Sequence, residues 1–292
     1  MSFQDALSRC AAETEALLDQ LLAVEGHASR RLVEAMRYAA LGQGKRLRPF
    51  LVVQSAALFD VPRPQALRVG AALECVHCYS LVHDDLPAMD DDDLRRGKPT
   101  AHKAYDEATA ILAGDALLTI AFEILSDAAT HPDPDVRLRL ISGLAKAAGA
   151  AGMAGGQMLD IEAEKRVTSS LADITRIQSL KTGALFRFAC EAGAILGQAD
   201  PAPLRQYADN IGLAFQIADD ILDVESTPEA LGKATQKDKT KGKATFVELL
   251  GFEEAKARAA ALTDEAVAAL KVYGERAMIL GEAAMFMVAR QY

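Results

Sequence analysis

The chain has 292 residues, of which half are apolar, and this length and apolar content exclude an intrinsically disordered protein. Its formal net charge of −9 at pH 7 excludes a broad nucleic-acid-binding surface, which needs clustered Lys and Arg, but not a small anionic ligand. Alanine and leucine dominate, tryptophan is absent, and β-branched residues do not form alternating runs. We therefore predict an all-α protein.

Glycine and proline divide the chain into segments of helical length. A break at residues 41–49 (LGQGKRLRP) precedes an apolar run at 50–59, and a turn at 61–64 (VPRP) leads into a helix predicted at 65–85. Pro87 should end that helix, because proline lacks the backbone N–H and clashes with the preceding turn. Further helices are predicted at 104–128, 136–163, 171–197, 202–225, 253–272 and 275–290, with polar loops at 131–135 and 226–245.

The segments show neither a repeat of fixed period nor a long linker, so we predict one helical domain over residues 1–292. Apolar stretches long enough to cross a membrane are interrupted by charges, the best candidates by Asp115 and by Arg187 and Glu191. Acidic and polar residues occupy the N-terminus, where a signal peptide has a basic start and an apolar core. We expect a cytoplasmic protein without a membrane span.

The four cysteines are Cys10, Cys75, Cys78 and Cys190. The CVHC spacing at 75–78 is compatible with a metal or redox site, but a structural zinc site needs a second ligand pair and the sequence offers none. We interpret the cysteines as small buried residues on helix faces.

Six aspartates lie within residues 84–93 of the stretch HDDLPAMDDDDLRRGK, followed by Arg95, Arg96 and Lys98. So many adjacent carboxylates repel each other unless a cation lies among them. Asp84, Asp85 and Asp90 are the candidate ligands of that cation.

A second acidic cluster lies in FQIADDILDVE at 215–225. Asp219 and Asp223 are four residues apart and share one face of a helix, with Asp220 beside them. Alone, this pattern is weak evidence for a functional site, because the solvent-exposed edge of an ordinary helix can have the same sequence by chance. Two such clusters in one chain favour a functional interpretation.

Ligand sets made of oxygen alone favour a hard cation, and Mg²⁺ is usually bound by one or two carboxylates together with substrate phosphate. A diphosphate held by Mg²⁺ would also need cationic donors, and Arg95 and Arg96 offer bidentate forks. Further basic or hydroxyl donors are Lys45, Arg46, Arg48, Lys181, Thr182, Lys233 and Lys243. Arg46 stands between two of these candidates, so it either joins them or points away.

Six motifs occur in this order: GKRLRP, DDLPAMDDDDLRRGKPT, GGQMLD, KTG, FQIADDILD and LGKATQKDKTKGKAT. Together they cover residues 44–245, and the chain resembles the short-chain trans-prenyl diphosphate synthases, most closely the bacterial-type farnesyl diphosphate synthases. The resemblance implies the isoprenoid synthase fold, an all-α bundle around a deep central cavity with the two acidic motifs on facing walls. It also implies a homodimer.

The resemblance further implies roles for matching positions. Asp84 and Asp90 would bind two Mg²⁺ ions and Asp219 a third, with Asp85, Asp220 and Asp223 completing the clusters. The ligands of the allylic diphosphate would be Arg95, Lys181, Thr182, Gln216, Lys233 and Lys243. These groups, together with Asp84, Asp85, Asp90 and Asp219, are the predicted catalytic residues. Isopentenyl diphosphate would be held by Gly44, Lys45, Arg48, His77 and Arg96. Without the resemblance, His77 would be interpreted as a hydrogen-bonded core residue.

The reaction implied is a prenyl transfer in which an allylic diphosphate, dimethylallyl and then geranyl, ionises and isopentenyl diphosphate attacks the carbocation. Loss of a proton gives farnesyl diphosphate. Tyr79 and Ser80 precede Asp84 by four or five residues, about 6 to 7.5 Å along a helix. A bulky residue at position 79 resembles the fifteen-carbon type, so we predict that Tyr79 limits product length; the alternative is a hydrogen-bonded core tyrosine.

Three other functions share part of this pattern. A geranylgeranyl diphosphate synthase has motifs that differ little. A terpene cyclase has no need of the GKRLRP site for a second diphosphate. A non-catalytic prenyl-diphosphate-binding subunit would be expected to have lost acidic or basic ligands, and both sets are complete here.

Overall fold

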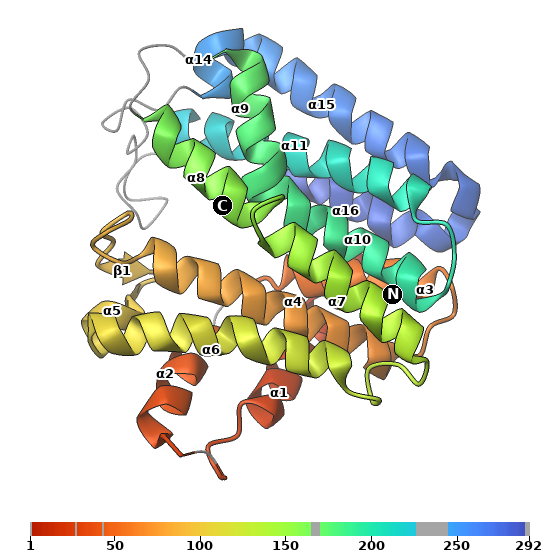
Figure 1. The fold of residues 1–292 in the computed structure, drawn as a ribbon. Helices are drawn as coiled ribbons and strands as arrows, with labels where there is room; N and C mark the ends of the chain where they lie inside the picture. Colours follow the sequence, from red (N-terminus) through yellow and green to blue (C-terminus); the bar gives the residue numbers. More distant parts are fainter. Residues whose placement is uncertain (1, 27, 43, 165–169, 226–244, 290–292) are drawn as a thin grey trace. The chain divides into compact units, whose positions relative to one another are not determined.

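The structure, a computed structural model, describes residues 2–26, 28–42, 44–164, 170–225 and 245–289 (Figure 1). Nearly every element in these residues is a helix. The two strands that they contain, β1 (Leu94–Arg95) and β2 (Lys98–Pro99), pair antiparallel through a two-residue turn. The predicted all-α class is therefore confirmed.

The chain divides into two compact units. Unit 1 comprises residues 1–53 and 61–141, and unit 2 comprises residues 54–60 and 142–292. The single domain expected from the sequence stays a prediction.

Unit 1 is built around α4 (Arg63–Asp84). Its other helices are α1 (Phe3–Leu21), α2 (Arg30–Ala40), the first part of α3 (Leu47–Ala57), α5 (Ala101–Ala104), α6 (Glu107–Ser126) and the first part of α7 (Pro134–Ala148). In Figure 1, α4 and α6 lie side by side, and α4 also packs against α1 and α2. Val69, Leu73 and Val76 are fully buried, so α4 forms the core of the unit.

Unit 2 is built around α11 (Ala202–Glu225). The remaining elements are α8 (Met153–Ala163), α9 (Leu171–Gln178), the π-helix η1 (Ser179–Gly183), α10 (Ala184–Leu196), α14 (Phe246–Leu250), α15 (Phe252–Ala269), the 3₁₀-helix η2 (Leu270–Ala277) and α16 (Met278–Val288). Figure 1 shows α11 beside α15, and α11 also contacts α10 and α16. The hydroxyl of Tyr207 on α11 is fully buried and donates to the Leu280 carbonyl at 2.7 Å, which satisfies its one donor inside the core.

The helices predicted at 65–85 and 202–225 are confirmed almost to the residue, and α4 ends three residues before Pro87. The single helix predicted at 136–163 is wrong. α7 ends at Ala148 and α8 begins at Met153, and the chain turns through Gly152, whose φ of −141° and ψ of −127° are not helical. This turn needs a glycine, because an added Cβ would lie 2.2 Å from the Ala147 carbonyl oxygen. The segment predicted at 171–197 is one helical run that contains the π-helix η1.

One described helix, α6, is long and apolar enough by composition alone to cross a membrane. The core helix of a water-soluble protein passes the same test, so this is weak evidence. Asp115 lies in the middle of α6, and the helix packs against α4.

Candidate active site

The first acidic cluster begins where α4 ends. The chain then turns back on itself: the Asp90 N–H donates to the Asp84 carbonyl at 2.8 Å, and the Asp92 N–H donates to the Asp85 carbonyl at 3.2 Å. Asp84 and Asp90, two of the predicted metal ligands, are six positions apart in sequence. The turn brings their backbones into direct hydrogen-bond contact.

Asp85 and Arg95 form an ion pair at this turn. Arg95 Nε lies 2.7 Å from Oδ1 and 2.9 Å from Oδ2 of Asp85, whose side chain is buried. Burial raises the pKa of the Asp85 carboxyl, and the hydrogen bond from Arg95 opposes that rise. The predicted metal ligand and the predicted diphosphate ligand are thus direct partners.

Arg96 lies at the tip of the β1–β2 turn. Arg96 and Gly97 both have positive φ, 52° and 75°, as a two-residue hairpin turn of type I′ requires. The Arg96 guanidinium lies over Gly44, where an added Cβ would be 2.7 Å from Nη1. Gly44 therefore leaves the space that Arg96 occupies.

Arg48 completes a basic group with these residues. Its Nη1 lies 3.4 Å from His77 Nε2. Burial, followed by the nearby Arg48 and Arg96, holds the pKa of His77 well below its usual range, so the imidazole is neutral and Nε2 can accept from Arg48. The structure thus brings together four of the five predicted isopentenyl diphosphate ligands: Gly44, Arg48, His77 and Arg96. Lys45, the fifth, is exposed beside them in sequence.

Arg46 points away from this group. Its guanidinium is buried and bonded to the carboxylates of Glu15 and Glu74. Of the two alternatives that the sequence left open, the second is confirmed.

In unit 2, Lys181 and Thr182 lie on the π-helix η1, a rare element that is frequent at functional sites. Lys181 Nζ donates to Asp160 Oδ2 on α8 at 2.7 Å. The two elements are in close contact: an added Cβ at Gly156 of α8 would lie 2.2 Å from the Lys181 backbone nitrogen. Gly156 is therefore required for α8 to approach the lysine this closely.

A polar chain runs from Thr182 to the second acidic cluster. Thr182 Oγ1 lies 3.5 Å from Gln216 Oε1, and Gln216 Nε2 lies 3.4 Å from Asp220 Oδ1. Asp220 Oδ2 accepts the Phe246 N–H at 2.8 Å, which places a carboxylate at the start of α14. Asp220 thus has a structural contact in addition to its predicted metal role.

The donor chemistry fits a hard cation. Asp219 and Asp223 are one turn apart on α11, and Asp84 and Asp90 are joined by a backbone hydrogen bond. Within the described residues, however, no three His, Cys, Asp or Glu side chains gather closely enough to hold a metal ion. The metal roles of the six aspartates stay predictions, and Lys233 and Lys243 lie outside the described residues.

The four cysteines are free and buried, which confirms their interpretation as core residues. Burial raises the pKa of Cys10 to about 11 and that of Cys78 to about 12. Thiols that stay protonated are poor nucleophiles and poor metal ligands, which argues against a redox or metal role for CVHC.

Three carboxylates of these clusters were not predicted: Glu15, Glu74 and Asp160. Asp160 could have been predicted from the sequence, since it is the last residue of the GGQMLD motif. Glu74 stands in an otherwise apolar run of α4, and a buried acid there needs a cationic partner. The exposed face of α1 gives no such signal for Glu15.

These features define a helical protein in which acidic helix ends and basic or polar groups suited to a phosphate ester lie together in each unit. The sequence pattern of the polyprenyl synthetase family matches residues 29–275. The chain is 47% identical over 283 residues to the farnesyl diphosphate synthase of Escherichia coli strain K12, covering 95% of this chain and 94% of that protein. It is 41% identical to the geranylgeranyl diphosphate synthase of Cyanophora paradoxa, covering 89% and 87%.

Solved structures agree. An FPP/GFPP synthase from Zymomonas mobilis, in its apo form, has a TM-score of 0.90 at 52% identity, covering 98% of this chain and 99% of that chain. A geranyltransferase from Legionella pneumophila has a TM-score of 0.88 at 34% identity, covering 99% and 98%. The chain therefore belongs to the polyprenyl synthetase family and has its all-α fold, which confirms the resemblance seen in the motifs. Membership implies prenyl diphosphate substrates and a divalent metal requirement.

Proposed function

We propose that the protein is a farnesyl diphosphate synthase that condenses isopentenyl diphosphate with dimethylallyl and then geranyl diphosphate. The observation that carries the proposal is the basic group formed by Gly44, Arg48, His77 and Arg96. It lies beside the acidic turn of unit 1 and offers a second place for a diphosphate. A cyclase that acts on one diphosphate has no use for this group.

Isopentenyl diphosphate would be bound through its diphosphate by Lys45, Arg48 and Arg96, while neutral His77 would contribute a hydrogen bond. Guanidinium forks match phosphate oxygens bidentately, so Arg48 and Arg96 would fix the orientation of the molecule. A fixed orientation converts attack on the carbocation into an effectively intramolecular step.

The allylic diphosphate would be held by Arg95, Lys181, Thr182 and Gln216. Lys181 is held in place by Asp160, and its charge would stabilise the leaving diphosphate more strongly as the bond breaks. At an effective dielectric near 20, a close contact between unit charges contributes about 4 kcal/mol before desolvation. The Thr182 hydroxyl and the Gln216 amide oxygen would face the allylic cation with their negative ends.

We assign Asp84, Asp85, Asp90, Asp219, Asp220 and Asp223 as the carboxylates that would hold Mg²⁺, three ions in all. Bound Mg²⁺ supplies positive charge that stabilises the departing diphosphate. No side chain is assigned as general base, since the diphosphate oxygens would accept the proton lost in the last step. A cytoplasmic location and a homodimer are proposed with this function.

Tyr79 supports a fifteen-carbon product. It lies on α4 five residues before Asp84, and its ring meets His83 edge to face with centroids 5.7 Å apart. The runner-up, a geranylgeranyl diphosphate synthase, is supported by the 41% identity to the Cyanophora paradoxa protein of that name.

The test is incubation of the purified protein with Mg²⁺, labelled isopentenyl diphosphate and either allylic starter, followed by chromatography of the dephosphorylated products. We expect a fifteen-carbon alcohol that disappears with EDTA and returns with excess Mg²⁺. Twenty carbons would support the runner-up. A protein that binds diphosphates but makes no product would contradict both and support a non-catalytic subunit.

A further inference from the structure

We propose that Arg46 is a positioning residue: held by Glu74 and Glu15, it keeps the basic group of unit 1 in the geometry that binds isopentenyl diphosphate. The proposal deepens the function proposed above and rests on it. It assigns a role to a residue of the GKRLRP motif whose side chain does not face the substrate.

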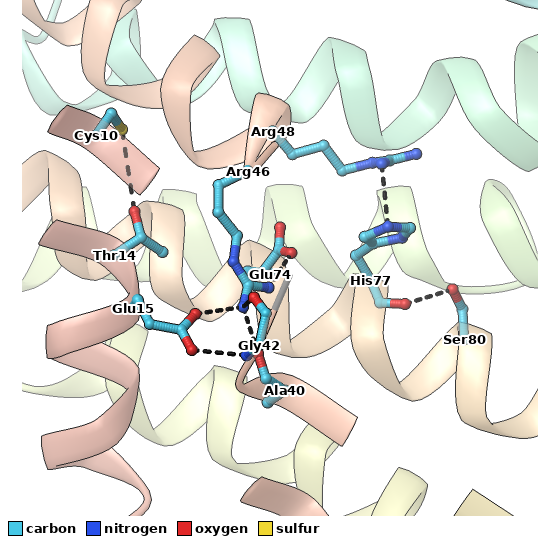
Figure 2. Close-up of polar contacts among 10 residues, drawn as sticks. All are labelled: Cys10, Thr14, Glu15, Ala40, Gly42, Arg46, Arg48, Glu74, His77 and Ser80. Atoms are coloured by element: carbon cyan, nitrogen blue, oxygen red, sulfur yellow. Dashed lines mark hydrogen bonds and ion pairs between the residues drawn. The ribbon is translucent and has the colours of Figure 1, made fainter. Parts of the chain in front are cut away.

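Arg46 is enclosed by acceptors from three parts of unit 1 (Figure 2). Nη1 lies 2.6 Å from Glu74 Oε1 on α4, and Nη2 lies 2.5 Å from Glu15 Oε2 on α1. Nη2 also donates to the Ala40 carbonyl at 2.6 Å, at the end of α2. Arg46 is 4% exposed and Glu74 is 2% exposed, so the pair is shielded from water. Such a pair is weak evidence for stability but specifies geometry when every charge has a partner.

The backbone of Arg46 is also unusual. Its φ of 48° is in the left-handed region, which residues other than glycine seldom adopt. The Arg46 carbonyl accepts the Phe50 N–H at 3.0 Å, the first turn of α3. The ion pairs therefore hold a strained residue at the start of the helix that carries Arg48.

Arg46 and Arg48 contact successive turns of α4. Arg46 binds Glu74, and Arg48 meets His77, three residues further along the same helix (Figure 2). Because Arg46 and Arg48 are only two residues apart, fixing the first contact fixes the start of α3 against α4 and hence the position of the second.

Glu15 and Arg46 also hold the loop before α3. Glu15 Oε1 accepts the Gly42 N–H at 2.6 Å, and the Gly42 carbonyl lies 3.3 Å from Arg46 Nη2. This loop carries Gly44, on which the Arg96 guanidinium rests. Gly44 and Arg48 are each two residues from Arg46, His77 is three residues from Glu74, and Arg96 contacts Gly44. Each member of the basic group is thus connected to the Arg46 cluster.

The charges are arranged so that Arg46 does not compete for the substrate. Nearby Glu74 raises the pKa of Arg46 against the effect of burial, so the guanidinium is permanently cationic and is neutralised by its own carboxylates. A diphosphate would therefore meet the charges of Arg48 and Arg96.

The first test compares Arg46→Lys with wild type in steady-state kinetics. A lysine has one compact charge and cannot bridge both carboxylates and a carbonyl in the same geometry. We expect the KM for isopentenyl diphosphate to rise by about tenfold or more, with the KM for geranyl diphosphate changed by less than about twofold. Arg63→Lys is the matched control, because it disturbs the partly buried Arg63–Glu13 pair of the same unit and should leave both constants unchanged.

Binding separates this proposal from the proposed function. Calorimetry with isopentenyl diphosphate in the absence of an allylic partner reports on the basic group without turnover, and inorganic diphosphate reports on both proposed diphosphate sites together. A wild-type protein that binds both but condenses nothing would contradict the proposed function alone. A folded Arg46→Lys protein that binds both as wild type does would overturn the positioning role.

If Arg46→Lys does not fold, Glu15→Gln supplies the test. Glu15 is at the edge of the cluster with a side chain 36% exposed, and an amide can still accept one bond. We expect the Kd for isopentenyl diphosphate to rise by about threefold, because Arg46 loses the charge of one carboxylate and keeps its bond to Glu74. Unchanged binding in this variant would count against the proposal.

Discussion

The guanidinium of Arg95 and the carboxylate of Asp85 are mutual partners, with Nε 2.7 Å from Oδ1 and Nη2 2.5 Å from the same oxygen. Each residue is predicted to bind something else in the reaction, Asp85 a metal ion and Arg95 a diphosphate. When a metal ion binds Asp85 and a diphosphate binds Arg95, each side chain would exchange its present ionic partner for another one. Neither charge would then be left buried without a partner of opposite sign.

Arg95→Lys should lower kcat/KM for the allylic substrate by about 100-fold, because a lysine replaces a bidentate fork by a single point charge. Steady-state kinetics with geranyl diphosphate as the varied substrate checks this. Arg30→Lys is the control: its pair with Glu34 is exposed and should be worth little. Equal effects of the two substitutions would contradict the assignment of Arg95.

Asp160→Asn should raise the KM for the allylic diphosphate by about tenfold, because Lys181 Nζ loses the carboxylate that orients it 2.7 Å away. The KM for isopentenyl diphosphate should change little, since the proposed ligands of that substrate do not touch Asp160. The two constants measured side by side provide the check, and a parallel rise in both would indicate a general structural defect.

The comparison of α4 with α7 shows what a sequence can predict. The extent of α4 followed from one apolar run and the position of Pro87, which are local signals. The break after α7 depends on how closely the backbone approaches Gly152, and the run of small residues around it hides that contact. Helices α1 and α2 were not predicted, although Ser2 and Asp5 form a capping box at the first of them.

The same limit holds for the site. The aspartates and Arg95 were predicted because their spacing is local and their charge is conspicuous. The partners of Arg46 were not, because Glu15 and Glu74 are 31 and 28 residues away and meet it only through the packing of α1 and α4. Ion pairs between residues far apart in the chain leave no local spacing pattern in the sequence from which they could be predicted.

Gly156→Ala should destabilise the protein by about 2 kcal/mol, because the added methyl must displace the Lys181 backbone from a tightly packed contact. The same shift should raise the KM for the allylic diphosphate. Gly281→Ala on α16 is the matched control, since nothing lies within 4 Å of its added Cβ and alanine favours a helix. Urea unfolding and kinetics of both variants would test the prediction; equal stability of the two would contradict it.

The buried cysteines predict a loss of stability at alkaline pH. Burial raises the pKa of Cys10 to about 11 and of Cys78 to about 12, so the folded chain keeps protons that the unfolded chain releases. This contribution is fully present below the ordinary thiol pKa of about 8.5 and falls as the pH rises toward 12. Cys78→Ala should flatten the fall in the free energy of unfolding; an unchanged slope would be evidence against a buried, protonated thiol.

Tyr79→Ala should lengthen the product. The tyrosine lies on α4 five residues before Asp84, and the phenol ring is the bulk that we predict stops the growing chain. Burial raises its pKa, with a further contribution from Asp84, so the hydroxyl stays neutral. Tyr79→Phe keeps the ring, removes the hydroxyl and should still release fifteen carbons. Chromatography of the dephosphorylated alcohols decides between the roles: if the alanine variant still stopped at fifteen carbons, Tyr79 would be an ordinary packing residue.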